Sequence, residues 1–193
     1  MKNSTNAKSL VGAVTASLLF LTQSVGAATI YSDDLSGFYE PELVNYVAAQ
    51  GSFPAVVIAN PFGPRADDAL LASLELPGFF PPTKLRATTV AARDDGHLVL
   101  VFNPVRTSNG NTACAAPAKQ NASGTVGAPG TLRLQAAFCY DDEVVSEAIM
   151  EMPRPTGLND RAFDQAMAQL MEVLLPSENR NLIGGCDNPA GGC

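Results

Sequence analysis

The sequence predicts an α+β fold: a two-layer domain with a mixed, mostly antiparallel sheet and helices packed on one face. Two observations support this class. Short apolar runs typical of strands occur between stretches with helical spacing, and two stretches have the pattern of β-hairpins. Because hairpins alternate with helices and no long repeat or domain boundary interrupts the chain, one α+β domain is favoured.

The first predicted elements are a helix and a strand. Residues 40–51 place Leu43, Tyr46 and Val47 on one helical face and end in a glycine, which is a common helix stop. Residues 54–60, "PAVVIAN", are β-branched and apolar on both faces. That composition predicts a central strand.

A second helix and a hairpin follow. The helix is predicted to begin near Ala66, with Leu70, Leu71 and Leu74 on its buried side, and the prolines of "LPGFFPP" end it. In "KLRATTVAARDDGHLVLVFNP", two β-prone runs flank "RDDG", whose Asp-Gly pair is typical of a tight turn. We therefore expect these two runs to pair as a hairpin.

The second half of the chain contains a loop, a hairpin and a helix. Residues 106–130 are rich in small and polar residues and have no period, which predicts a long loop. Residues 131–152 predict a second hairpin that turns at "YDDE". Residues 159–176 give the clearest helical pattern in the chain, with Asn159 or Asp160 as its N-cap.

The first 28 residues have the three-part form of a secretory signal peptide. Lys2 and Lys8 precede the apolar run "LVGAVTASLLFLT", and small residues follow it, so we expect cleavage after Ala27 or Ala28. The run is too short to span a bilayer, although an uncleaved anchor is the alternative interpretation. These features predict a periplasmic or secreted protein with no transmembrane segment in the mature chain.

The mature chain is predicted to form a single α+β domain over residues 29–179, followed by a disulfide-closed C-terminal tail over residues 180–193. The full chain has a formal net charge of −7 and no basic run. A chain this acidic repels nucleic acid and anionic membrane surfaces, which excludes both as partners.

Four cysteines behind an export signal predict two disulfides. Three pairings exist for four cysteines. We favour Cys114 with Cys139, which ties the long loop to a strand, and Cys186 with Cys193, which closes "CDNPAGGC". A metal site is not expected, since no C-x-x-C occurs and the single histidine, His97, is far from every cysteine in the sequence.

Catalytic chemistry has little support in the sequence. His97 is expected at a strand end near solvent, and with this single histidine there are few options for the base that a serine or cysteine nucleophile needs. Four Asp-Asp pairs suggest calcium, but three of them occur where turns and helix starts favour aspartate, and no D-x-D-x-D-G loop occurs. No cofactor is expected.

A short repeat marks the candidate ligand site. "VVIANPFGPR" and "VLVFNPVR" both run from an apolar strand into Asn-Pro and then reach an arginine. If the two strands are parallel neighbours, Asn60, Arg65, Asn103 and Arg106 would converge at the carboxyl edge of the sheet, in a pocket suited to a carboxylate or another anion. In the alternative interpretation each asparagine closes its strand by bonding the backbone, and the arginines are solvated.

Several stretches together resemble a group of uncharacterised exported proteins of α-proteobacteria. The resemblance covers roughly residues 51 to 179 and rests on "NPF", "LVLVFNP", "AAFCYDDEVVSEA" and "FDQAMAQLMEVLLPSEN". It implies a periplasmic or surface location and supports the pairing of Cys114 with Cys139. Many members of the group are lipoproteins, whereas this chain has no cysteine at the expected cleavage point. The group implies no activity and no functional residues.

These observations predict an exported cell-envelope protein that is non-enzymatic and binds a partner or stabilises an assembly. The partner would be an unidentified envelope protein. The alternative function is the binding of a small molecule or anion by the two Asn-Pro strand ends. An enzyme is the third interpretation, and it requires a nucleophile and a base within hydrogen-bond reach.

Overall fold

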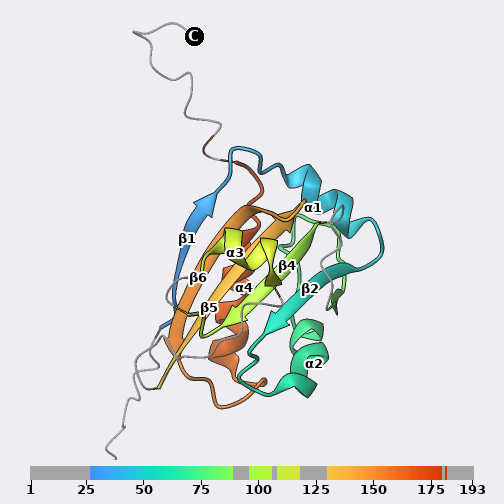
Figure 1. Ribbon diagram of the computed structural model, residues 1–193. Helices are drawn as coiled ribbons and strands as arrows, with labels where there is room; N and C mark the ends of the chain where they lie inside the picture. Colours follow the sequence, from blue (N-terminus) through green and yellow to red (C-terminus); the bar gives the residue numbers. More distant parts are fainter. Residues whose placement is uncertain (1–26, 89–95, 106–107, 118–129, 180, 182–193) are drawn as a thin grey trace, which may run out of the picture.

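The computed structural model describes residues 27–88, 96–105, 108–117, 130–179 and 181 (Figure 1). The helices and strands follow one another in the order β1 (Thr29–Leu35), α1 (Pro41–Ala48), β2 (Phe53–Ile58), α2 (Asp67–Ala72), β3 (Leu85–Ala87), β4 (His97–Phe102), α3 (Gly110–Ala115), β5 (Thr131–Tyr140), β6 (Glu143–Pro153) and α4 (Arg161–Leu174). One turn of 3-10 helix, Pro64–Ala66, leads directly into α2. Residues 1–26 of the expected signal peptide, and residues 180 and 182–193 of the expected tail, lie outside the described residues.

The strands form one mixed sheet in the order β1-β6-β5-β4-β2-β3. The pairs β1–β6, β5–β6 and β4–β5 are antiparallel, while β2 is parallel to both β3 and β4. The predicted α+β class, with a mixed and mostly antiparallel sheet, is therefore confirmed. Within the described residues, no helix is both long enough and apolar enough to cross a bilayer.

The hairpin predicted for residues 84–104 is wrong. Its two strands, β3 and β4, do not pair with each other; they run parallel on either side of β2. Phe53 of β2 is in register with Leu85 of β3, and Ala55 with Leu98 of β4. The Asp-Gly turn signal describes only local chain geometry, whereas this pairing depends on a strand from earlier in the sequence.

The second predicted hairpin is confirmed. β5 and β6 pair over their whole length, and the turn between them has positive φ at both Asp141 (52°) and Asp142 (61°). Two left-handed residues in succession define the turn that matches the twist of antiparallel strands. Aspartate tolerates this conformation better than most side chains, which explains why the turn forms without a glycine.

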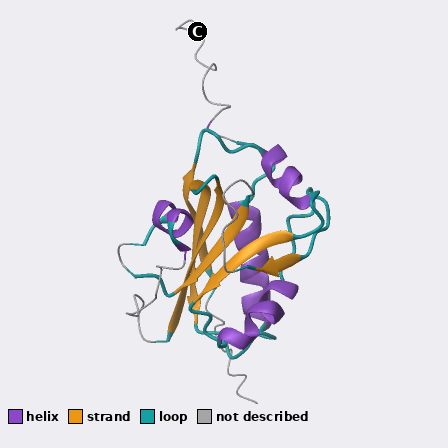
Figure 2. Ribbon diagram, turned by 45° about the vertical axis from the view of Figure 1, so that its right-hand side comes forward, coloured by secondary structure: helices purple, strands orange, loops and turns teal. Residues whose placement is uncertain are grey.

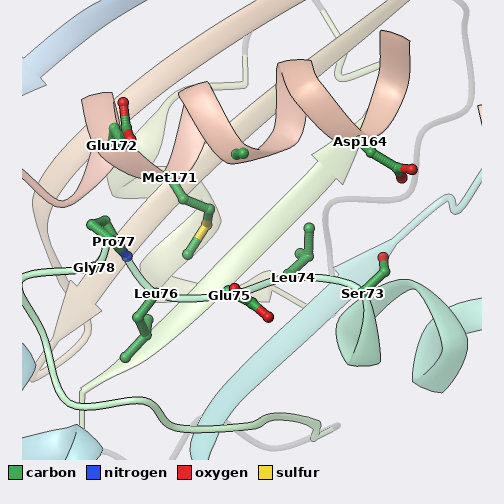
Figure 3. Close-up of a pocket in the computed structure, with 10 residues that line it drawn as sticks. Ser73, Leu74, Glu75, Leu76, Pro77, Gly78, Asp164, Met171 and Glu172 are labelled. Atoms are coloured by element: carbon green, nitrogen blue, oxygen red, sulfur yellow. The ribbon is translucent and has the colours of Figure 1, made fainter. Parts of the chain in front are cut away.

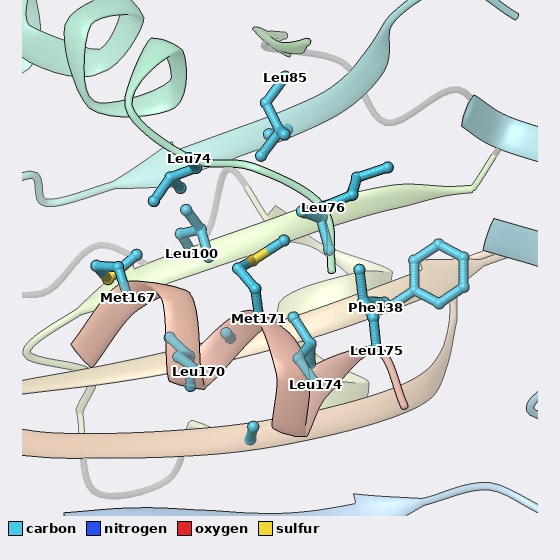
Figure 4. Packing of buried hydrophobic residues seen from close by; sticks show 14 of the residues in the cluster. Leu74, Leu76, Leu85, Leu100, Phe138, Met167, Leu170, Met171, Leu174 and Leu175 are labelled. Carbon is cyan, nitrogen blue, oxygen red and sulfur yellow. The ribbon is translucent and has the colours of Figure 1, made fainter. Parts of the chain in front are cut away.

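The main core lies between one face of the sheet and the helices α1, α2 and α4 (Figures 1 and 2). Figure 4 shows Met167, Leu170 and Met171 of α4 packed beside Leu100 of β4. Burying a side chain of this size stabilises the fold by roughly 1.5–3 kcal/mol. As predicted, Asp160 caps α4: its side chain accepts a hydrogen bond from the Ala162 N–H.

The buried face of the first helix differs from the sequence prediction. Val44, Val47 and Ala48 are buried in α1, while Tyr46 is exposed and Leu43 is only partly buried. The apolar spacing fits two overlapping faces of so short a helix, and the packing of the helix on the sheet decides between them.

A short helix covers part of the opposite face of the sheet, which corrects the expectation that helices lie on one face only. In Figure 2, α3 lies on one side of the sheet and α1, α2 and α4 lie on the other. Ala113 and Cys114 of α3 pack against Val99 and Val101 of β4 in a second, smaller core. Every residue of β4 is buried. A central strand that is apolar on both sides needs cover on both faces, and α3 provides some of it.

Candidate functional site

The two Asn-Pro strand ends lie at the same edge of the sheet. β2 and β4 are parallel neighbours, and Ile58 is in register with Val101, so Asn60 and Asn103 both follow the carboxyl ends of adjacent strands. The backbone is left-handed at Ala59 (φ 56°) and at Asn103 (φ 49°). The structure thus satisfies the geometric condition for a shared site, although Arg106 lies outside the described residues.

The asparagine side chains nevertheless bind their own surroundings. Asn60 Oδ1 accepts a hydrogen bond from the Phe62 N–H (3.0 Å), and its Nδ2 donates to Asp67 Oδ1 (2.7 Å). Asn103 Oδ1 accepts from the N–H of Arg133 on β5 (3.3 Å). Arg65 is exposed. Both asparagines therefore agree with the alternative interpretation, in which the side chain at each strand end forms hydrogen bonds with nearby groups and does not bind an anion.

A larger concave site lies beside α2. We call it the α2 cleft; it has a volume of ≈ 610 Å³ and is lined by residues 71–72, 74–76, 78, 80 and 82–85. Most of these residues are apolar, and they include Leu71 and Ala72 of α2, Phe80 of the following segment and Leu85 of β3. Clefts of this size with apolar linings are the usual places where proteins bind ligands or partner side chains.

The irregular segment 73–84 is held in place by side chains that reach the core. The main core includes the buried side chains of Leu74, Leu76 and Phe80. Figure 4 shows Leu74 and Leu76 near Met171 of α4. A backbone hydrogen bond from the Phe80 N–H to the Pro77 carbonyl fixes the turn formed by residues 77–80. The cleft therefore exists before any partner binds, which lowers the entropic cost of binding.

A smaller pocket lies on the other side of the same segment. We call it the α4 pocket; it has a volume of ≈ 250 Å³ and is lined by residues 73–78, 164, 168 and 171–172. Figure 3 shows Asp164 and Glu172 at opposite ends of the pocket on α4, and Glu75 across from them on the segment. Residues 74–76 and 78 line both sites, so the cleft and the pocket are neighbours.

An exposed aromatic side chain lies next to both sites. Phe79 is 53% exposed, and its ring lies 4.7 Å from that of buried Phe80, measured between centroids. Large apolar side chains at the surface are informative when they adjoin a cleft, because aromatic residues are enriched in binding surfaces. The stretch "LPGFFPP" carries this signal in the sequence: two phenylalanines lie between prolines, where neither a helix nor a strand accounts for them.

The chemistry of the lining residues suits binding. Ser73 donates its hydroxyl hydrogen bond to the Leu70 carbonyl (2.7 Å), and Thr83 donates to the Pro81 carbonyl (3.1 Å). The residues that line the two sites include carboxylates and Lys84 but no histidine or cysteine. The hydroxyl hydrogens of Ser73 and Thr83 are thus bonded to backbone carbonyls and not to a side-chain base.

A buried polar group lies under α3 on the opposite face of the sheet. The Glu147 side chain accepts hydrogen bonds from the Gly110 N–H (2.8 Å) and from Gln135 Nε2 (2.7 Å). In the same region, Cys114 of α3 and Cys139 of β5 are joined by the disulfide favoured from the sequence, whereas Cys186 and Cys193 lie outside the described residues. This arrangement fixes α3 to the sheet.

His97 is not near solvent, in contrast to the expectation from the sequence. It is 1% exposed at the start of β4 and is in register with Cys139. Its burial follows from the central position of β4, which is covered on both faces. Across the described ranges, no group of three or more histidine, cysteine or acidic side chains is placed to hold a metal ion.

Comparison of the chain with models of known protein families, with curated proteins and with solved structures finds no match. The fold is of the α+β class, and the larger of the two concave sites described above is a mostly apolar cleft beside an acidic pocket. A function therefore has to follow from these residues themselves.

Proposed function

We propose that this chain is an exported, non-enzymatic protein of the cell envelope that binds a partner protein through the α2 cleft. The single observation that carries the proposal is the cleft itself, with its ≈ 610 Å³ volume and its mostly apolar lining. Removal of apolar surface from water is the main source of affinity in such sites, at about 25 cal/mol per Å². The export step rests on the signal-like residues at the start of the sequence.

The position of the cleft favours a protein partner over a fully enclosed small molecule. The cleft lies between α2 and β3, an edge strand of the sheet, and it is bordered by exposed Phe79. An open apolar surface with a protruding aromatic ring is typical of sites that receive side chains of another protein. Binding of an anion at the strand ends has less support, because Asn60 and Asn103 already bond neighbouring groups.

The test obstructs the cleft without disturbing the core. Ala72 and Ala69 are both exposed on α2, but only Ala72 lines the cleft. We expect Ala72→Trp to fill part of the cleft, while Ala69→Trp adds the same side chain to the same helix outside it. Both variants are compared with the wild type by affinity capture from an envelope extract, with quantitative mass spectrometry of the captured proteins.

The expected result is at least one captured protein whose recovery falls about tenfold with Ala72→Trp and is unchanged with Ala69→Trp, a ratio that corresponds to about 1.4 kcal/mol of binding free energy. Thermal unfolding of each variant checks that the fold is intact. An identical set of captured proteins for the wild type and both variants would contradict the proposal.

A further inference from the structure

The α4 pocket differs from the α2 cleft in its charge. Three of the residues that line it are acidic, Glu75, Asp164 and Glu172, and none is basic. They surround apolar lining residues that include Leu74 and Met171. A partner that reaches across segment 74–78 from the cleft therefore meets a small pocket of negative potential.

These three carboxylates have no structural task in the described part of the chain. Other acidic side chains do: Glu151 binds Arg133 (2.6 Å), and Asp160 caps α4. Within the described ranges, no hydrogen bond or ion pair engages the carboxylates of Glu75, Asp164 or Glu172, and all three residues are exposed. Like charges around one pocket repel one another, so a cation bound there would relieve an unfavourable arrangement.

We propose that the partner segment recognised by this protein combines apolar residues with a lysine or arginine, and that the cationic side chain enters the α4 pocket while the apolar residues fill the α2 cleft. This inference rests on the proposed partner-binding function and adds the chemistry of the partner. The pocket volume of ≈ 250 Å³ admits one long side chain. The apolar stem of lysine or arginine packs against residues such as Met171, and its charged end reaches the carboxylates at the rim.

The charges around the two sites also determine which of them receives the cationic residue of the partner segment. The α2 cleft is lined by one acidic residue, Glu75, and one basic residue, Lys84, whose charges offset each other, whereas the α4 pocket is lined by three acidic residues and no basic one. A cation on the partner is therefore favoured in the α4 pocket over the cleft. Exposed ion pairs contribute little individually, so loss of all three carboxylates should weaken binding by roughly tenfold, with a smaller effect at high salt.

The test uses a random twelve-residue peptide library displayed on phage, selected on the immobilised mature chain. The variant E75Q/D164N/E172Q removes the three charges of the pocket. The matched control, E42Q/E143Q/E178Q, removes three exposed charges that line neither site. Peptides that bind the wild type are synthesised, and their dissociation constants are measured on the wild type, both triple variants and Ala72→Trp.

The expected result is enrichment of peptides with a basic residue next to apolar residues. Their affinity should fall roughly tenfold on E75Q/D164N/E172Q, remain unchanged on the control and fall on Ala72→Trp. Apolar peptides that bind both triple variants equally would overturn this inference and leave the proposed function standing. Enrichment of acidic peptides would also overturn it. If no selected peptide distinguishes the wild type from Ala72→Trp, both the inference and the proposed use of the cleft fail.

Discussion

The backbone N–H of Gly110 donates a hydrogen bond to Oε2 of Glu147, and this contact joins the first residue of α3 to the middle of β6. Glu147 is 4% exposed, so its side-chain oxygens depend on such donors in place of water. The contact is close: a Cβ atom on residue 110 would lie 2.5 Å from Val144 Cγ2 and 2.7 Å from Glu147 Oε2. The position of α3 thus depends on a residue without a side chain.

Replacement of Gly110 by alanine should therefore destabilise the protein. We expect Gly110→Ala to lower the free energy of unfolding by roughly 1–3 kcal/mol, because either the hydrogen bond to Glu147 or the packing of Val144 must give way. Urea unfolding measures the change. Gly157→Ala is the control, since an added Cβ there meets no atom within 4 Å. Equal stabilities of the two variants would show that the contact is not tight.

The disulfide between Cys114 and Cys139 should contribute more to the free energy of unfolding than any single contact of α3. Its cysteines are 25 residues apart, so loss of the cross-link through Cys114→Ala/Cys139→Ala should cost about 3 kcal/mol. Urea unfolding in a Cys186→Ser/Cys193→Ser background isolates this bond. In that background, a thiol titration of the unreduced, denatured protein should detect no free thiol. Detection of two thiols would contradict the pairing.

The N-cap of α4 should make stability depend on pH in the acid range. Hydrogen bonds from the backbone N–H groups of Thr156 and Ala162 hold the pKa of Asp160 below its ordinary value of 3.8. The charged form is thus favoured by folding, so its contribution is present above the unfolded-state pKa and is lost as pH falls through the folded-state value.

Consequently, Asp160→Ala should lower the Tm at neutral pH, and the difference in Tm from the wild type should narrow below about pH 4. Asp160→Asn retains an N-cap side chain and should preserve most of the neutral Tm with a weaker pH dependence in that range. Thermal unfolding at a series of pH values measures both effects. A constant difference in Tm down to pH 2 would contradict the assigned role of the carboxylate.

The strand-end asparagines should act on stability and not on anion binding. Loss of the hydrogen bonds of Asn60 to Phe62 and Asp67 through Asn60→Ala should cost roughly 1–2 kcal/mol in urea unfolding. A ligand that binds only the folded state raises the Tm. Inorganic phosphate should therefore shift the Tm of the wild type and of Arg65→Ala equally. A phosphate-dependent rise that Arg65→Ala abolishes would restore the anion-binding alternative.

The fold class is predictable here because the strongest elements have clear local patterns. The apolar period of α4, its Asp160 cap and the β5–β6 hairpin are all encoded by residues close together in the sequence. The placement of β3 and β4 depends on pairing with a strand that is distant from β4 in the sequence. The "RDDG" signal suggests a turn between them, but β2 lies between the two strands in the sheet, and no short-range pattern reports that arrangement.

Two features of the structure were missed for different reasons. Helix α3 is too short to show a period; its one local signal is the capping box in which the side chains of Asn109 and Thr112 bond each other's backbone N–H. The α2 cleft is built by an irregular segment, where spacing carries no information. Only the unusual pair Phe79-Phe80 between prolines marks it, and the exposure of Phe79 becomes evident from the packing.

Partner binding through the α2 cleft can be tested by site-specific photo-cross-linking in the producing cell, with a photoreactive phenylalanine analogue placed at residue 72 or at residue 69. Both positions are exposed on α2, and only residue 72 lines the cleft. We expect a discrete cross-linked partner from residue 72 and none from residue 69. Cross-links from residue 69 alone, or the same products from both positions, would contradict partner binding through the α2 cleft.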